Sequence, residues 1–200
     1  MVMRSKSVPR CIRCRMHAPR CICEHIAPVN TDTRLVVVMH FRERAKATAT
    51  APLALQALRN SELKVHGLVD APLASSCFDT ANRRLLYLYP SDDATVLSPG
   101  FAADGPRVTL VVPDGSWRQA HRMRRRIPGL ENAEPVRLPR GEPSRWGLRR
   151  ETEGERLCTY EAIARAMGIL EGASVRQRME ALFDRMMESV IASRGRRRRI

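Results

Sequence analysis

Blocks of apolar residues alternate with polar, turn-forming residues along the chain, and their lengths and periods predict strands and helices in turn. Short apolar runs rich in β-branched residues are typical of strands that are buried in a sheet. Such runs occur at residues 34–41, 64–69, 83–90, 110–112 and 134–139. Pro90 ends the third of them. These runs predict the strands of one sheet.

Helical periodicity marks the segments between and after these strands. We predict a helix after Thr50, with Pro52 in its first turn, and a second helix from Ser116. Two further helices are predicted, one after Thr159 and one after a Ser174-x-x-Gln177 capping box. Their apolar faces contain Ile163, Ala166, Met167 and Leu170, and then Val175, Met179, Leu182, Phe183, Met186 and Val190. Strands that alternate with helices predict an α/β fold with a largely parallel sheet flanked by helices.

The cysteines are concentrated near the N-terminus. Four of the six lie within residues 11–23, as the C-x2-C pair Cys11 and Cys14 and the C-x-C pair Cys21 and Cys23. Secreted disulfide proteins distribute their cysteines more evenly, so we interpret these four as metal ligands. Four thiolates complete the tetrahedron that a structural Zn²⁺ prefers and leave no open position for catalysis. Two alternatives stay open: a chance cluster of buried thiols, or a site in which His17 or His25 replaces one cysteine.

The charge of the chain indicates a polyanionic partner. Its 35 lysines and arginines exceed its 21 aspartates and glutamates by 14, and the pI is near 10.8. RNA, DNA or an anionic membrane surface would each suit this excess. The arginine-rich ending, residues 193–200, adds to it. No apolar run reaches the roughly 20 residues that span a bilayer, and the N-terminus lacks the apolar centre of a secretory signal. We therefore expect a cytoplasmic protein with no membrane span.

Polar clusters follow three of the predicted strands, at the edge where open α/β sheets bind their ligands. They are His40 with Glu43, Ser91–Asp93, and Asp114–Ser116. Each cluster also has an interpretation as turn or cap chemistry. Residues 91–97 in particular predict a turn that enters a helical turn, with Ser91 or Asp92 as its cap.

The helix predicted from Ser116 has two contrasting sides. Its apolar stripe consists of Trp117, Ala120, Met123 and Ile127, and we expect Trp117 to anchor the helix in the core. The opposite side carries four arginines: Arg118, Arg122, Arg125 and Arg126. They indicate either contact with a phosphate backbone or a solvated charged face.

Several common catalytic motifs are missing from the sequence. It contains no G-x-G-x-x-G, no G-x-x-x-x-G-K-[ST], no G-x-S-x-G and no H-E-x-x-H. This argues against a dinucleotide-binding fold of the usual kind, a P-loop NTPase and a simple hydrolase.

Five motifs in order resemble the DTW-domain family of tRNA-uridine aminocarboxypropyltransferases. They are the C-x2-C…C-x-C start, "LYPSDDAT", "PDGSWRQAHRM", "SRWGLR" and "CTYEAIARAM". Each motif alone is weak, but five in the family's order and spacing are specific, and they extend from about Cys11 to about Leu170. The resemblance implies a SPOUT-like α/β domain with a knotted cofactor pocket. It also implies a transferase that uses S-adenosylmethionine and moves its 3-amino-3-carboxypropyl group onto N3 of a uridine in tRNA.

The resemblance carries over roles for individual residues. It implies that Asp114, Ser116 and Trp117 form the catalytic signature. The residues that it implies for the cofactor are Ser91, Asp92, Asp93, Arg149, Thr159 and Glu161. Chemistry leaves alternatives within these roles: Asp114 is a general base or a positioning group, and Glu161 is a helix cap or a cofactor contact. A guanidinium such as that of Arg149 suits the cofactor carboxylate.

The sequence also departs from the family pattern. Ser116 stands where Thr is usual, and Cys158 precedes Thr159 where Ser is common. Trp146 replaces an expected Tyr, which puts any role of a phenol hydroxyl there in doubt. "MHFRER" lacks a proline after His40, and no asparagine precedes Thr50.

These observations predict three segments and one main function. The segments are a four-cysteine zinc-binding segment at 1–30, a catalytic domain at 31–192 and a basic tail at 193–200. A SPOUT-type RNA methyltransferase and a non-catalytic, zinc-bearing RNA-binding module remain as alternative functions. The sequence predicts tRNA as the partner, but neither the modified position nor an oligomeric state.

Overall fold

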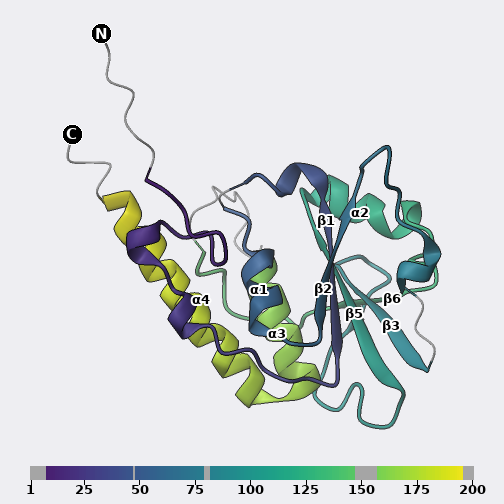
Figure 1. Cartoon of the computed structure of the whole chain (residues 1–200). Helices are drawn as coiled ribbons and strands as arrows, with labels where there is room; N and C mark the ends of the chain where they lie inside the picture. Colours follow the sequence, from purple (N-terminus) through teal and green to yellow (C-terminus); the bar gives the residue numbers. More distant parts are fainter. Residues whose placement is uncertain (1–7, 47, 79–81, 147–156, 196–200) are drawn as a thin grey trace.

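Parallel strands form the centre of the structure (Figure 1), a computed structural model that describes residues 8–46, 48–78, 82–146 and 157–195. The strands are β1 (Arg34–His40), β2 (Ser61–His66), β3 (Arg83–Leu88), β4 (Thr95–Val96), β5 (Arg107–Asp114) and β6 (Glu134–Arg137). They lie in the order β2-β1-β5-β3-β6-β4, and each neighbouring pair is parallel. The predicted α/β fold with a largely parallel sheet is confirmed.

Helices cover both faces of this sheet. The helices α1 (Ala51–Ala57), α3 (Thr159–Glu171) and α4 (Ala173–Gly195) lie on one face, and α2 (Trp117–Arg126) lies on the other (Figure 1). Alternate residues of β1 show this division, because Val37 packs in the core beneath α1, α3 and α4, whereas Val36 packs with Met123 of α2. Short 3-10 helices occur at Ala18–Arg20, Cys23–His25, Phe41–Glu43 and Ser75–Phe78.

The strand predicted at 64–69 lies three residues earlier in the structure. β2 pairs with β1 from Ser61 to His66, and Gly67, with a φ of +91°, then turns the chain away. The prediction was shifted because β2 is an edge strand. It is only partly covered, so polar residues such as Glu62 occupy positions that a central strand fills with apolar ones.

The helical turn predicted within residues 91–97 is wrong. Thr95 and Val96 form the short strand β4, which pairs with Val136 and Arg137 of β6. Both residues are β-branched and lie beside the edge of β6, so pairing with that edge overrides the local turn signal.

The helix starts agree with the sequence in part. Ser116 forms a capping box with Gln119 at the start of α2, as predicted. Thr50 precedes α1, but its hydroxyl accepts a hydrogen bond from the backbone N–H of Tyr160 at 3.2 Å instead of capping α1. α4 begins at Ala173, so Ser174 lies inside the helix and the capping box predicted there is wrong.

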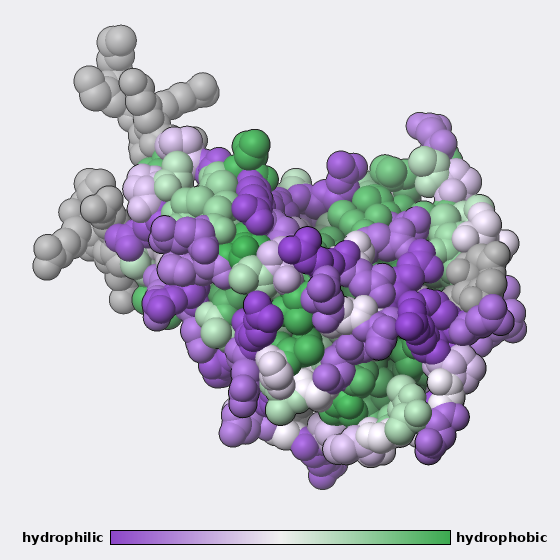
Figure 2. Space-filling model, turned by 60° about the horizontal axis from the view of Figure 1, so that its bottom comes forward, coloured by the Kyte–Doolittle hydropathy of each residue, from purple (hydrophilic) through white to green (hydrophobic). Residues whose placement is uncertain are grey.

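Among the helices of the described residues, none is both long and apolar enough to cross a bilayer. The face in Figure 2 carries hydrophilic side chains over most of its area, with smaller apolar areas between them.

Candidate functional site

A pocket of about 550 Å³ opens at the carboxyl ends of β3, β5 and β6. Tyr89 and Pro90 after β3 line it, as do Pro113 and Gly115 around the end of β5 and the segment 137–144 after β6. The first residues of α2 and α3 complete the wall. Its volume is typical of small-molecule sites, and it lies at the sheet edge where the sequence predicted one.

Asp114 lies behind the wall of this pocket. It is the last residue of β5, its residue is only 4% exposed, and it does not itself line the cavity formed by the described residues. The hydroxyl of Thr159 donates a hydrogen bond of 2.6 Å to Asp114 Oδ1, and Thr159 does line the pocket. The Asp114 carboxylate is therefore linked to the pocket by its hydrogen bond with the Thr159 hydroxyl.

Trp117 lies at the pocket wall, which corrects the prediction that it anchors α2 in the core. It is 38% exposed, and its ring lies 5.9 Å from that of Tyr89, which in turn lies 5.9 Å from that of His121. Trp117 is the first residue of α2, so it lies at the strand end and not over the sheet. The core contacts of this region come from Met123 and Ile127 instead.

Glu161 links residues 144 and 145, which follow β6, to the start of α3. Its two oxygens accept hydrogen bonds from Ser144 Oγ at 2.5 Å, from the backbone N–H of Arg145 at 2.7 Å and from that of Cys158 at 3.1 Å. With Cys158 it forms the capping box of α3. Burial raises the pKa of the Cys158 thiol to about 12, which keeps this thiol neutral. Of the two interpretations of Glu161, the structure supports the helix cap.

The remaining residues predicted for the cofactor lie apart from the pocket or outside the described residues. Ser91, Asp92 and Asp93 do not line it, and Asp93 forms an ion pair of 2.7 Å with Arg124 of α2. The Arg124 guanidinium lowers the pKa of Asp93. Arg149 lies outside the described residues. The α2 arginines predicted to bind RNA are exposed, as expected: Arg118, Arg122, Arg125 and Arg126.

Three arginines of the pocket were missed by the sequence reasoning. Arg137, Arg140 and Arg165 line it, beside the carboxylate of Glu142. Arg165 follows Thr159 by six residues on α3, which is not a same-face spacing, so the sequence pattern alone did not place it beside Thr159. Arg137 is the last residue of β6, and Arg140 lies in the irregular segment after it, where spacing says little.

His40 and Glu43 form a separate cluster at the β1 and β2 end of the same sheet edge. The rings of His40 and His66 lie 6.3 Å apart, and burial lowers the pKa of both. Glu43 is buried and accepts a hydrogen bond from Lys46 at 2.5 Å. The three predicted strand-end clusters thus share one edge, but they do not form one site.

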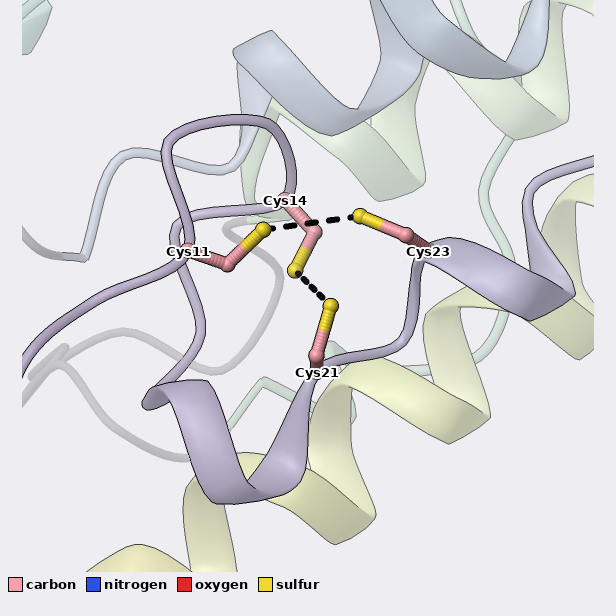
Figure 3. A group of neighbouring side chains, drawn as sticks. All are labelled: Cys11, Cys14, Cys21 and Cys23. Atoms are coloured by element: carbon pink, nitrogen blue, oxygen red, sulfur yellow. Dashed lines mark hydrogen bonds between the residues drawn. The ribbon is translucent and has the colours of Figure 1, made fainter.

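The four N-terminal cysteines form a compact group (Figure 3). Their sulfur atoms all lie within 4.8 Å of one another, with 3.5 Å between Cys11 and Cys23 and 3.7 Å between Cys14 and Cys21. Four sulfurs at about 2.3 Å from a tetrahedral zinc ion lie about 3.8 Å apart, so the group fits this metal. The cluster among the described residues contains the four cysteines and neither His17 nor His25.

The pKa values of the cysteine group are shifted in both directions. Backbone N–H groups of Cys14 and Arg13 stabilise the thiolate of Cys11 and lower its pKa to about 6, whereas burial raises the pKa of Cys14 and raises that of Cys23 to about 12. A thiolate that is present at neutral pH is the form that binds a metal.

The cysteine segment is attached to the rest of the fold by packing and by hydrogen bonds. Met16 and Ile22 are buried in the same core as α1, α3 and α4. The Gln56 side chain of α1 donates to the Arg13 carbonyl at 2.7 Å, and Ser189 Oγ of α4 donates to the Arg20 carbonyl at 2.9 Å. A metal that orders this segment therefore also supports the packing of two helices.

Comparisons with known proteins agree with the order of the motifs. The family model of the DTW domain matches residues 8–191. The chain is similar to "tRNA-uridine aminocarboxypropyltransferase 2" of Mus musculus, with 29% identity over 178 residues, or 82% of this chain. It is also similar to the protein of the same name from Drosophila melanogaster, with 26% identity over 168 residues, or 81% of this chain. The matches span 57% and 66% of these relatives' own lengths. No solved structure matches the chain significantly.

Proposed function

The chain belongs to the DTW-domain family, and on this premise we propose that it is a tRNA-uridine aminocarboxypropyltransferase. In the proposed reaction, the 3-amino-3-carboxypropyl group of S-adenosylmethionine passes to N3 of a uridine in tRNA. The products are acp3U and methylthioadenosine. The observation that carries the proposal is the pocket at the strand ends, where residues of the family signature after β5 meet the start of α3.

At the transferred carbon, the reaction forms one bond and breaks one, and the N3–H bond also breaks. Uridine N3 forms a bond to the carbon beside the sulfonium sulfur, the carbon–sulfur bond breaks, and its electron pair makes the sulfur a neutral thioether. The N3 proton must leave to a base. A sulfonium has three electrophilic carbons, so the carbon that reacts is the one held in line with N3. The protein's task is therefore to hold two substrates in one pose.

We assign the removal of the uridine N3 proton to Asp114 and Thr159. Because the Thr159 hydroxyl donates to Asp114 Oδ1, its oxygen lone pairs are free to accept from a group in the pocket, such as the N3–H of uridine. The proton then passes through the hydroxyl towards the carboxylate. In this proposal Asp114 acts through Thr159 and does not touch the uridine directly.

The other walls of the pocket fit the two substrates. The exposed Trp117 ring and Tyr89 offer aromatic faces on which a base can stack once it has left its own stack in an RNA loop. Apolar residues such as Leu138 and Ala162 suit the flat adenosine part of the donor. The knot implied by the family stays a prediction.

The proposal is tested with purified protein, S-adenosylmethionine and unmodified tRNA. We expect methylthioadenosine by liquid chromatography, and an RNA nucleoside heavier by one aminocarboxypropyl group by mass spectrometry. A nucleoside that gains only a methyl group would identify the chain as an RNA methyltransferase. RNA binding without any small-molecule product would identify it as a binding module.

The arginines of α2 provide a test of the RNA surface. Replacing Arg122 and Arg125 by glutamine is expected to weaken tRNA binding. The logarithm of the binding constant is also expected to fall less steeply with the logarithm of the salt concentration, by the amount that corresponds to a loss of up to about two phosphate contacts. Binding of S-adenosylmethionine is expected to stay unchanged. Fluorescence titrations of labelled tRNA at several salt concentrations measure this. Arg178→Gln together with Arg185→Gln on α4, across the sheet, removes the same number of charges and is the control. An equal loss in the control would contradict a role specific to α2.

A further inference from the structure

One side of α3 presents three residues to the pocket at three-residue intervals. Thr159, Ala162 and Arg165 all line it. At 1.5 Å of rise per residue, about 9 Å of helix axis separate Thr159 from Arg165. The small side chain of Ala162 leaves space between them, so this row has room for a ligand along it.

The guanidinium of Arg165 has no anionic partner among the described residues. Neither the ion pairs nor the hydrogen bonds of this part of the chain involve it, although its side chain is half-buried. Glu142 is the carboxylate that lines the same pocket, and it forms no ion pair with Arg165. A cation that is partly removed from water and has no counter-charge attracts an anion.

The Arg165 guanidinium lies close to the loop after β6. A Cβ atom at Gly141 would come within 3.3 Å of Arg165 Nη1, so the glycine leaves room for the guanidinium there. The two other arginines of the pocket differ from Arg165. Arg137 and Arg140 are exposed, and Arg137 Nε also donates to the Ala94 carbonyl at 3.3 Å. The less solvated Arg165 is thus the stronger anion site of the three.

The row on α3 also has a polarity. Its first residue is hydrogen-bonded to the carboxylate of Asp114, and its last is an arginine. A donor whose carboxylate lies a few ångströms from its reacting carbon matches this arrangement, with the carboxylate at Arg165 and the reacting carbon towards Thr159, where the uridine N3 is proposed to lie. A guanidinium binds a carboxylate through two parallel hydrogen bonds, which also fixes its orientation.

We propose that Arg165 binds the carboxylate of the aminocarboxypropyl donor and so orients the carbon chain that is transferred. This inference rests on the proposed function. It identifies a donor-binding residue to which the resemblance assigned no role, although Arg165 lies within the "CTYEAIARAM" motif. The same chemistry would suit a phosphate of the RNA, and the experiment below separates the two anions.

Binding is measured by isothermal titration calorimetry with S-adenosylmethionine and with decarboxylated S-adenosylmethionine, which lacks the carboxylate. We expect the unaltered protein to bind S-adenosylmethionine at least tenfold more tightly than the decarboxylated compound. Arg165→Gln is expected to weaken binding of S-adenosylmethionine by about tenfold to a hundredfold, the range for a hydrogen bond to a charged group. Its affinity for the decarboxylated compound is expected to stay the same or to rise.

Two further variants make the result specific. Arg178→Gln removes the same charge from α4, outside the pocket, and is expected to keep the preference for the carboxylate. Arg165→Lys keeps the charge but loses the two parallel hydrogen bonds, so an intermediate affinity is expected. Thermal unfolding of each variant confirms that it is folded before binding is compared.

Three outcomes overturn the inference. If Arg165→Gln binds both compounds like the unaltered protein, Arg165 does not contact the carboxylate. If the variant loses tRNA affinity and salt dependence but keeps its affinity for S-adenosylmethionine, the anion is an RNA phosphate. If the unaltered protein does not bind S-adenosylmethionine at all, the proposed function is wrong and the inference fails with it.

Discussion

Asp114→Asn is expected to lower the rate of methylthioadenosine release by about 10² to 10⁴-fold, the range for loss of a general base. Asparagine keeps the size of the side chain, and its amide oxygen can still accept from the Thr159 hydroxyl. It has no negative charge with which to take up the uridine proton. Affinity for S-adenosylmethionine is expected to change little, because Asp114 does not line the pocket. Single-turnover rates and calorimetry on the same preparation measure both quantities.

Variants of Thr159 separate a relay from a purely structural hydrogen bond. Thr159→Ser keeps the hydroxyl and is expected to retain most of the rate, whereas Thr159→Val is expected to lose a large part of it. A base that must be ionised makes the rate fall as the pH is lowered, so the acidic limb of the pH–rate profile is expected to disappear in Asp114→Asn. If Asp114→Asn stays within tenfold of the unaltered protein, or Thr159→Val equals Thr159→Ser, the relay is wrong.

The sequence predicted the layers of this fold because apolar periodicity reports burial. The run at β1 is buried on both faces and was placed to within one residue, and the α3 face was correct as well. The errors in the strands fall at the edges of the sheet. β2 and β4 are only partly covered or exposed, so their sequences carry turn and polar signals that the pairing of the strands overrides.

The site was predicted less completely, since a motif names residues without placing them. Asp114 and Thr159 were both singled out, yet the sequence did not indicate that one lies behind the other. Trp117 has the spacing of a core residue, but its place at the first turn of α2 leaves it at the pocket wall. Arg137 ends β6, and only the three-dimensional structure shows that this strand end lies at the pocket.

Replacing Cys14 by serine is expected to release zinc and to lower the free energy of unfolding by about 4 kcal/mol, as for other losses of a structural metal. Cys14 is the most buried of the four cysteines, and a serine hydroxyl there does not replace a thiolate ligand. Zinc content by elemental analysis and thermal unfolding measure the two effects. Cys77→Ser, at a half-buried cysteine outside the group, is the matched control and is expected to change neither.

Loss of the metal is expected to destabilise more than the N-terminal segment, because residues of that segment are buried in the same core as α1 and α4. Without the metal, the contacts of Met16 and Ile22 with this core weaken, as do the hydrogen bonds from Gln56 and Ser189. Hydrogen exchange is therefore expected to rise in α4 as well as in residues 8–26. The pocket lies at the strand ends and takes none of its lining from the cysteine segment, so binding of S-adenosylmethionine to the folded fraction is expected to persist. Unchanged zinc content in Cys14→Ser would show that the four thiolates are not the ligands.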